Sequence, residues 1–574
     1  MTATTRPHPV LRGIESVAAL YPRDVDPSDD LRLAIDFLDW PITAATVTRA
    51  GYVFGSAVAL LLGLSVPLAV SWSPVVGALV AVSAGLLAAH AVHTAPLLWA
   101  TARRTRALGA TPDLVARVVL SMRLAPTPER AADFTARTGT GRLAASLGTH
   151  VRQSHHTARS GLIAFGDAWA DLFPALRRSV TLVAAAGEAP AHDRGRLLDR
   201  ALRVVMDGTR DQMQSFGARI RTPVTALYAF GVLLPTALVA LLPAGGATGV
   251  TVTPLSVVVL YNVVLPSMLV GAGIWLLARR PVAFPPPEVT AEQPDVPDRR
   301  RLALAAGAVG ALVGWLVAWR LLPWWGAPIA AAGLGTGLAL WLQYRSIVSE
   351  YGRIRRIEGS LPDALSLVGR RVANGRAVET AIQQAAEELD GETGAFLAAG
   401  ATRQRQLQVG VREAFLGRHG ALEGVPSPRV RGSIALLGLA AREGRPAGSA
   451  LLSLAEHVDD LQTIEQEARH SLTHVCRTLQ TTGMLFAPMV AGATVALADG
   501  IDSAEFLAAS GRSLGWLGGP VGLYVLVLAA ILTALSTGIT RGLDRALVGY
   551  RAGRALICAT VTYCSSYVLV GVVI

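Results

Sequence analysis

Two pairs of histidines are the first residues whose spacing suggests chemistry. His90 and His93 stand three residues apart and His470 and His474 stand four apart, so each pair would share one face of a helix. Paired imidazoles can hold a metal ion, but a zinc site needs further ligands. The sequence places none, since Cys476 lies off the face of the second pair. We therefore predict no metal site, and we expect His90 and His93 to be hydrogen-bonded near a membrane interface.

The peptide GRSLG at 511–515 matches the GxSxG pattern of a hydrolase nucleophile. That chemistry needs a strand before the serine and a helix after it, because the sharp turn between them exposes the hydroxyl. Here a polar loop leads into a long apolar stretch. We therefore interpret the match as accidental.

Lysine is absent from the chain, so all 52 basic residues are arginine. A P-loop needs a lysine on the nucleotide phosphates, and Schiff-base catalysis needs an amine side chain. The three cysteines, Cys476, Cys558 and Cys564, form no CxxC motif, which argues against disulfides and cysteine-bound metal. The sequence thus excludes P-loop and Schiff-base chemistry and predicts no cofactor.

Long uncharged stretches decide the predicted architecture. Charged residues make up only 16% of the chain and hydrophobic residues 52%, and seven stretches of 18 to 57 residues contain no charge. A helix needs about 20 apolar residues to cross a bilayer, so the two longest stretches, 50–102 and 222–278, each have room for two spans. The predicted fold class is therefore an all-α polytopic membrane protein with about nine transmembrane helices.

Arginines gather on one side of these spans. Arg103, Arg104, Arg279 and Arg280 lie close to span ends, as does the arginine-rich segment 541–554, and all fall on the same side of a nine-span chain. Positive residues near span ends favour the cytoplasm. We therefore predict a protein of the cytoplasmic membrane whose N-terminus is cytoplasmic and whose C-terminus lies outside.

Two long polar loops on that side share an order of features. The loop at 101–221 holds 19 arginines and 10 acidic residues, and the loop at 344–479 holds 17 and 16. Each opens with Pro-Asp, which suits a helix N-terminus, and neither contains a strand-like alternation. Matching features stay about 250 residues apart, which indicates an internal duplication. We interpret each loop as a cytoplasmic bundle of about six helices.

Glycines mark expected sites of close helix packing. Each loop runs into a span that contains a glycine followed by a proline. Small residues let helices approach one another, so these four residues are the candidates for helix packing or for a groove that receives another helix: Gly231, Pro235, Gly483 and Pro488. The GxxxG patterns at 310–314 and 333–337 predict close packing as well, either within the chain or in a dimer.

Charge and apolar runs together set the predicted boundaries. A proline-rich stretch, which cannot build a core, separates the two halves. The predicted segments are a cytoplasmic N-terminal segment (1–49), transmembrane helices 1 and 2 (50–100), a first cytoplasmic helical domain (101–221), transmembrane helices 3 and 4 (222–278), a linker (279–301), transmembrane helices 5 and 6 (302–343), a second cytoplasmic domain (344–479), and transmembrane helices 7 (480–498), 8 (514–537) and 9 (556–574).

Two peptides of the second loop resemble a known family. LPDALSLVGRRVANGRAVETAI, which begins at Leu361, resembles the opening of the F domain of type II secretion systems. GLAAREGRPAGSALLSLAEHVDDL, with Glu443 and Gly444 at its turn, resembles the second hairpin of that domain. The first loop is similar but divergent. The number of spans resembles the archaeal members, which are the assembly platforms of archaeal pili and of the archaellum.

The resemblance implies a function without catalysis. Platforms of this family sit in the cytoplasmic membrane, receive motion from a hexameric secretion ATPase and move pilin subunits from the bilayer into a filament. The expected partners are therefore this ATPase, pilin-like subunits and membrane lipids, and an even-fold motor suits a homodimer. The candidate contacts with the ATPase stand beside two turns of the second domain: Arg370, Arg371, Arg376, Arg442, Glu443 and Arg445.

Two other functions remain open at this point. A transporter or permease subunit driven by a separate ATPase would share the spans and the missing P-loop, but it predicts a polar path at mid-membrane, which the sequence does not show. A membrane receptor scaffold would need no motor. Nucleic acid is not an expected partner, because the arginine-rich first loop lacks interleaved aromatic residues for base stacking.

Overall fold

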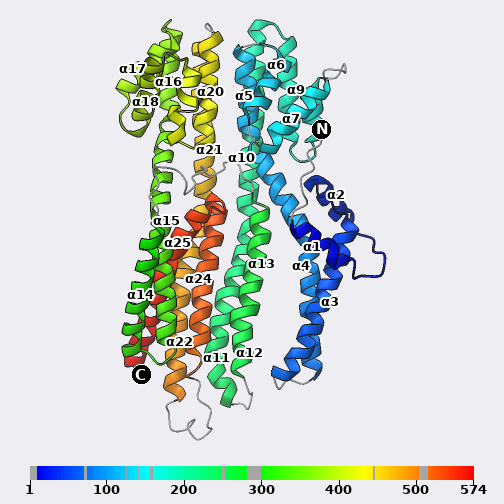
Figure 1. The fold of residues 1–574 in the computed structure, drawn as a ribbon, viewed down its shortest axis with the longest axis vertical. Helices are drawn as coiled ribbons and strands as arrows, with labels where there is room; N and C mark the ends of the chain where they lie inside the picture. Colours follow the sequence, from blue (N-terminus) through cyan, green and yellow to red (C-terminus); the bar gives the residue numbers. More distant parts are fainter. Residues whose placement is uncertain are drawn as a thin grey trace.

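The computed structural model describes residues 9–69, 74–124, 126–139, 141–154, 160–247, 253–280, 299–443, 447–502 and 515–573. Helices make up nearly all of these residues, and no strand occurs among them. The all-α prediction is therefore confirmed for the described chain. Long helices form an extended layer at one end of the molecule, and two groups of shorter helices stand side by side at the other (Figure 1).

The chain begins with two short helices and a long hairpin. Helices α1 (Pro9–Ala18) and α2 (Asp29–Leu38) precede α3 (Ala44–Ala69) and α4 (Pro74–Gly109). The Ser28 hydroxyl caps α2, which buries Leu31 and Leu38 against its neighbours. Helices α3 and α4 approach closely where Gly55 faces Gly85, because a β-carbon on Gly55 would come within 2.6 Å of the Gly85 carbonyl oxygen.

The first bundle contains six helices around one apolar core. Prolines occupy the first turns of α6 and α9, where a missing N–H costs nothing. Leu147, Phe165, Leu176 and Leu198 are fully buried between the helices. The six helices are α5 (Thr111–Leu124), α6 (Pro128–Thr138), α7 (Gly141–Ser154), α8 (Gly161–Ala168), α9 (Pro174–Glu188) and α10 (Ala191–Tyr228).

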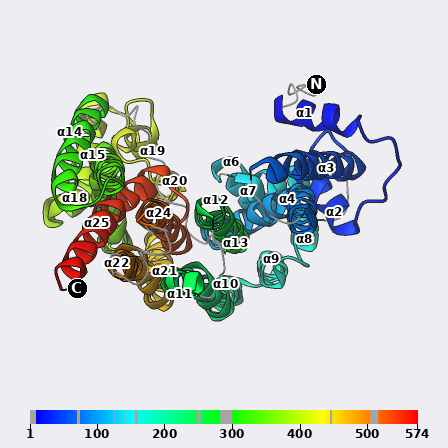
Figure 2. The same cartoon turned by 90° about the horizontal axis from the view of Figure 1, so that it is seen from below.

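Helix α10 continues from this bundle into the layer of long helices. The next elements are η1 (Ala229–Leu233), α11 (Leu234–Ala247), α12 (Pro254–Val259), η2 (Leu260–Val264) and α13 (Leu265–Ala278). Seen from below, α10 to α13 lie in the middle of the molecule, with α3 and α4 on one side (Figure 2).

The second half of the chain has the same kinds of element. A hairpin of α14 (Arg300–Leu321) and α15 (Gly326–Gly359) leads into α16 (Leu361–Ala373), α17 (Val378–Glu388), α18 (Gly391–Leu407), α19 (Val411–Leu416), η3 (Ala421–Gly424), α20 (Pro428–Glu443) and α21 (Ala447–Thr481). These pack around a second core, in which Ile382 and Phe415 are fully buried. The chain ends with η4 (Thr482–Phe486), α22 (Ala487–Asp502), α24 (Gly518–Arg541) and α25 (Arg545–Val573).

Eight described helices are long and apolar enough to cross a membrane, so the protein is a multi-pass membrane protein. They carry many exposed large apolar side chains, such as Leu60, Leu86 and Leu304, which is the burial expected of helices that face lipid. The sequence predicts nine spans. The ninth predicted span is the start of α15, at 326–343, which contains four glycines. That this segment crosses the membrane stays a prediction. The candidate spans are 44–64, 77–123, 191–239, 254–278, 300–321, 476–500, 518–541 and 545–573.

Several predicted domain boundaries fall inside continuous helices. Helix α4 passes through residue 100, α10 through residue 221 and α15 through residue 343. A change of charge along a helix marks where it leaves an apolar environment, but it does not break the backbone hydrogen bonds. Membrane and polar segments are therefore joined by unbroken helix.

The GxxxG patterns are used within the chain. A β-carbon on Gly314 would come within 2.8 Å of the Ala330 carbonyl oxygen, so α14 packs tightly on α15. A β-carbon on Gly337 would come within 2.9 Å of the Gly553 carbonyl oxygen and 2.7 Å of Ile557 Cγ1, so α15 packs equally tightly on α25. Of the two open alternatives, packing within the chain is therefore the one observed here.

We expect Gly337→Val to lower the stability of the protein. The new side chain meets backbone atoms of α25, so the helices must move apart, and overpacking of this kind costs about 1–3 kcal/mol. The matched control is Gly271→Val, because nothing lies within 4 Å of a β-carbon at Gly271. Thermal unfolding in detergent measures both, and equal melting temperatures for the two variants would contradict the tight contact between α15 and α25.

Candidate functional site

Three of the long helices widen into a π-helical turn just before a proline. The turn η1 precedes Pro235, η2 precedes Pro266, and η4 precedes Pro488. A proline has no N–H, and its ring clashes with the carbonyl four residues earlier, so an ordinary helical turn does not fit there. A wider turn relieves that clash and keeps the helix continuous. The predicted pairs Gly231–Pro235 and Gly483–Pro488 mark two of these three sites.

A tyrosine satisfies the carbonyl that Pro235 leaves without its usual donor. Gly231 lies four residues before Pro235, and the Tyr524 hydroxyl of α24 donates a hydrogen bond to the Gly231 carbonyl. The Tyr261 hydroxyl of η2 donates to the Pro235 carbonyl at 2.6 Å. The two rings meet edge to face with centroids 5.4 Å apart. The two buried hydrogen bonds together link η1 and α11 to η2 and to α24.

Tyr261 and Tyr524 do not follow from the sequence prediction of this site. The sequence nevertheless contains a reason to look for such residues. A proline inside a span leaves a backbone carbonyl without its usual donor, and a buried tyrosine hydroxyl needs an acceptor. The sequence gives no indication of which phenol meets which carbonyl, since Gly231 and Tyr524 are 293 residues apart.

The four predicted packing residues are all buried among the helices of this chain. A β-carbon on Gly231 would come within 2.5 Å of the Leu269 side chain, and one on Gly483 within 3.4 Å of Ala529 and Leu532. Pro235 and Pro488 are buried as well. The two glycines therefore contact α13 and α24, which is the close helix packing that the sequence predicts for them.

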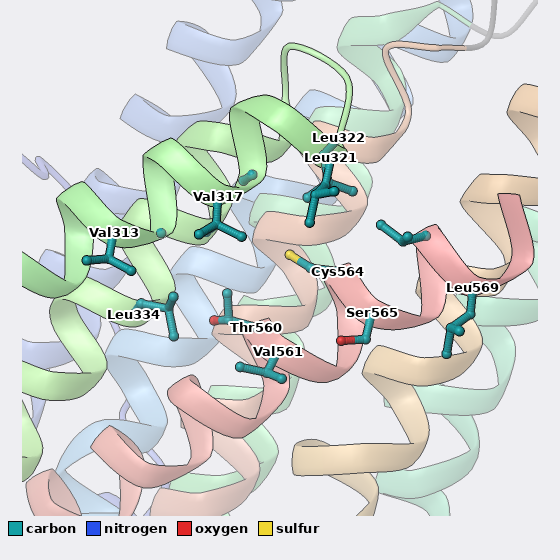
Figure 3. A pocket seen from close by; sticks show the side chains of 14 residues that line it. Val313, Val317, Leu321, Leu322, Leu334, Thr560, Val561, Cys564, Ser565 and Leu569 are labelled. Atoms are coloured by element: carbon teal, nitrogen blue, oxygen red, sulfur yellow. The ribbon is translucent and has the colours of Figure 1, made fainter. Parts of the chain in front are cut away.

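An apolar groove is present elsewhere in the layer. It lies between α14, α15 and α25 and has a volume of about 450 Å³ (Figure 3). Val313 and Val317 of α14 line one side, and Val561 and Leu569 of α25 line the other (Figure 3). Apolar side chains dominate its walls, so its chemistry suits an apolar helix or a lipid chain.

The predicted ATPase contacts come from the ends of helices that meet at the tip of the second bundle. A β-carbon on Gly448, at the start of α21, would come within 2.5 Å of the Ala373 Cα at the end of α16. The end of α16 therefore adjoins the start of α21. Arg370 and Arg376 are exposed there.

Arg371 differs from Arg370 and Arg376 because its side chain is engaged within the bundle. Arg371 forms an ion pair with Glu388 at the end of α17, and its side chain is only 25% exposed. This arginine therefore holds α16 to α17. Helix α20 ends at Glu443, but the side chains of Arg442 and Glu443, and Arg445 altogether, lie outside the described residues.

The two bundles meet along α5, α10, α20 and α21. Met206 of α10 packs with Leu461 and Ile464 of α21, and Arg210 makes two hydrogen bonds to Glu467, at 2.9 and 2.7 Å. A polar cleft of about 590 Å³ follows this contact. His457 is buried at its wall, and burial lowers the pKa of its imidazole to about 4, so the ring is neutral at pH 7.

The histidines of the two pairs considered in the sequence do not form a metal site among the described residues. His93 Nε2 lies 3.1 Å from the Thr48 carbonyl oxygen, and its ring meets Tyr52 edge to face, so the expected hydrogen bond is confirmed for this residue. His470 is exposed, and the side chain of His474 lies outside the described residues. Within the described ranges, no three His, Cys, Asp or Glu side chains are placed to share a metal ion.

Comparisons of the chain with protein-family models, with curated proteins and with solved structures give no match. The family is therefore not shown by relatives. Inferences about function must come from the residues and their arrangement.

We expect Tyr524→Phe to cost about 1–3 kcal/mol of stability, because it leaves the buried Gly231 carbonyl without a donor. In a Pro235→Ala background the new backbone N–H can bond to Gly231, so the same substitution should cost less there. Thermal unfolding of the four variants in this double-mutant cycle measures the difference. Tyr344→Phe is the control, since no hydrogen bond of its hydroxyl is found among the described residues. An identical cost in both backgrounds would show that the phenol and the proline act independently.

Proposed function

We propose that the protein is the platform of a machine related to type IV pili or type II secretion, in the cytoplasmic membrane. It would couple a cytoplasmic hexameric ATPase to the insertion of pilin-like subunits into a filament. One observation carries this proposal: both helical bundles stand at the same end of the span layer, and unbroken helices join each bundle to the spans (Figure 1).

Four helices are long enough to act as levers. Helices α4, α10, α15 and α21 contain 36, 38, 34 and 35 residues, and each extends from the span layer to a bundle. A continuous helix resists bending, so a force on a bundle is transmitted to the spans with little loss. The π turns η1 and η4 directly follow α10 and α21 and supply the points at which such levers could bend.

We further propose that the two halves arose by duplication. Helices α5 to α10 and α16 to α21 occur in the same order, and each set starts with Pro-Asp in its first turn. Each set ends in a long helix that enters a π turn followed by a proline. Repetition of such an unusual feature at matching places supports a common origin more strongly than helix number alone.

The bundle end is proposed to be cytoplasmic. Arg103, Arg279, Arg280 and Arg541 all lie where span helices reach this end, and positive residues near span ends favour the cytoplasmic side. With nine crossings the N-terminus is cytoplasmic and the C-terminus lies outside.

The tip of the second bundle is the proposed docking site of the ATPase. Arg370 and Arg376 are exposed at the far end of the bundle, beside the start of α21. Charged residues at such a tip favour a partner of opposite charge and raise the rate of association. A dimer of the platform would match the even symmetry of a hexameric motor.

The apolar groove between α14, α15 and α25 is the proposed seat for the helix of a pilin-like subunit. A helix that leaves the bilayer must be held by apolar contacts on a lipid-facing surface, and this groove offers them. Gly231, Pro235, Gly483 and Pro488 are proposed to act at the bends of the lever helices, where they pack within the chain.

We expect Arg370→Glu with Arg376→Glu to abolish copurification of the ATPase and filament formation, because reversed charge repels an acidic partner surface. Arg371 is left unchanged, since its ion pair with Glu388 belongs to the bundle. The matched control is Arg418→Glu with Arg431→Glu, two exposed arginines of the same bundle that lie away from this tip. Normal piliation by the first variant would remove the tip from the docking site, whereas an equal loss in both variants would indicate a general charge effect.

We expect labelling with a membrane-impermeant maleimide to place both bundles on one face of the membrane. Single cysteines replace Arg130 of α6, Arg405 of α18 or Trp324 between α14 and α15, all exposed, in a chain without its three natural cysteines. Trp324→Cys should react in intact cells, and the other two only after lysis. If Arg130→Cys reacts in intact cells and Arg405→Cys does not, the platform proposal is contradicted, because one ATPase could not act on bundles that lie on opposite faces of the membrane.

A further inference from the structure

Five arginines from five different segments gather where the spans meet the second bundle. Arg280 follows α13, Arg355 lies on α15, Arg469 on α21, Arg541 ends α24, and Arg551 lies in the first turns of α25. Each lies close enough to others of the group for their charges to repel. In Figure 1 the ends of α24 and α25 lie below the second bundle, next to α15 and α21.

The carboxylates near this arginine cluster are already engaged. Glu465 is shared between Arg469 and Arg429, the latter at 2.9 Å. Glu358 accepts a hydrogen bond from the Ser427 hydroxyl at 2.6 Å. These two carboxylates therefore do not balance five guanidinium groups.

Asp544 is the acidic residue nearest in sequence to Arg541, and it is engaged as well. It accepts a hydrogen bond from the Tyr351 hydroxyl at 2.7 Å and another from the backbone N–H of Leu547 at 2.8 Å. Its role is to cap α25 and to fix α15 beside it. The cluster therefore retains a positive charge among the residues that the structure describes.

The contacts of the arginines themselves leave two of them without a partner. Arg280 Nε donates to the Ile539 carbonyl at 2.6 Å, and Arg551 Nη1 lies 3.5 Å from the Thr537 hydroxyl. Arg355 and Arg541 form no hydrogen bond or ion pair with any described residue, although both are partly buried. Partly buried charge of one sign is costly unless an ion of opposite sign joins it.

Burial confirms that these are not ordinary surface arginines. It lowers the pKa of Arg280 to about 10, with a further contribution from the charge on Arg469. Burial also lowers the pKa of Arg355, again with repulsion from Arg469. Arg280 nevertheless remains cationic at neutral pH, so it can attract an anion.

We propose that this arginine cluster binds the phosphate group of an anionic phospholipid. A guanidinium group presents parallel N–H donors that fit two phosphate oxygens, so several converging arginines form a strong phosphate site. The cluster lies at the ends of α13 and α24, which is the depth of lipid headgroups in a membrane. A soluble phosphate would share the chemistry, but this position favours the lipid.

Helix ends alone do not account for the cluster. Arg280 and Arg541 lie at the carboxyl end of α24, where a cation is stabilised by the free carbonyls. That effect leaves Arg551 unexplained, since this residue lies in the first turns of α25. A bound phosphate would reduce the repulsion among these arginines and would join the spans α13, α24 and α25 to the bundle helices α15 and α21.

The test compares the intact protein in nanodiscs of phosphatidylcholine with and without phosphatidylglycerol. We expect phosphatidylglycerol to raise the melting temperature of the unmodified protein and to leave Arg355→Gln with Arg541→Gln unchanged. In pure phosphatidylcholine this variant should be at least as stable as the unmodified chain, because it loses repulsion. Arg103→Gln with Arg106→Gln is the control: it removes two exposed arginines from the end of another span and should keep the lipid effect.

Other outcomes are equally decisive. A lipid effect of the same size in the Arg355/Arg541 variant overturns the proposal, and so does the absence of an effect in the unmodified protein. If inorganic phosphate added to phosphatidylcholine discs gives the full effect, the phosphate site stands and the lipid source is wrong. If the effect appears only after Glu288, Glu292, Asp295 and Asp298 are neutralised, the linker occupies the cluster instead of a lipid and the proposal fails. A variant that is less stable than the unmodified protein in pure phosphatidylcholine also overturns the proposal, because the two arginines would then stabilise the fold without a lipid.

Discussion

Every backbone carbonyl and N–H inside a bilayer must find a partner within the protein, and the rest of this structure depends on that requirement. It explains why helices dominate and why the long helices pass from the spans into the bundles without a break. It also explains what happens at the prolines. Each of the three prolines that follow a π turn removes a backbone N–H donor from a span, and the helix accommodates the proline by forming a wider turn. At Gly231 a tyrosine hydroxyl from a distant helix supplies the missing hydrogen bond.

The same low polarity governs where charge can lie. The apolar layer exposes leucine and valine outward, and arginines gather where its helices end. On the bundles some of the charges form ion pairs, as Arg371 does with Glu388 and Arg210 with Glu467. At the junction beneath the second bundle, several arginines converge without enough carboxylates among the described residues. That imbalance is what distinguishes the junction from an ordinary polar interface.

A platform function would draw on both features. Unbroken helices make the bundles and the spans mechanically continuous, and the π turns place the possible bends at matching positions in the two halves. The glycine contacts of α14, α15 and α25 hold another part of the layer rigid and leave a groove at its surface. Helices that can bend at the π turns, next to a rigid group of helices, would allow a force on the bundles to displace a helix held in the span layer.

The sequence by itself determined the helical class, the places of the apolar runs and the helices of both polar loops, because these depend on local composition and on proline at helix starts. It also indicated Gly231, Pro235, Gly483 and Pro488 as special, and the structure places these buried residues in or just after two π turns. It predicted nine spans where eight are apolar enough, since glycine-rich 326–343 is uncharged but only weakly apolar. Only the tertiary structure decided that Tyr524 meets Gly231, that Arg280 and Arg551 share one cluster, and that the groove lies between α14 and α25. Such contacts join residues hundreds of positions apart, and a single sequence carries no local signal for which distant helices become neighbours.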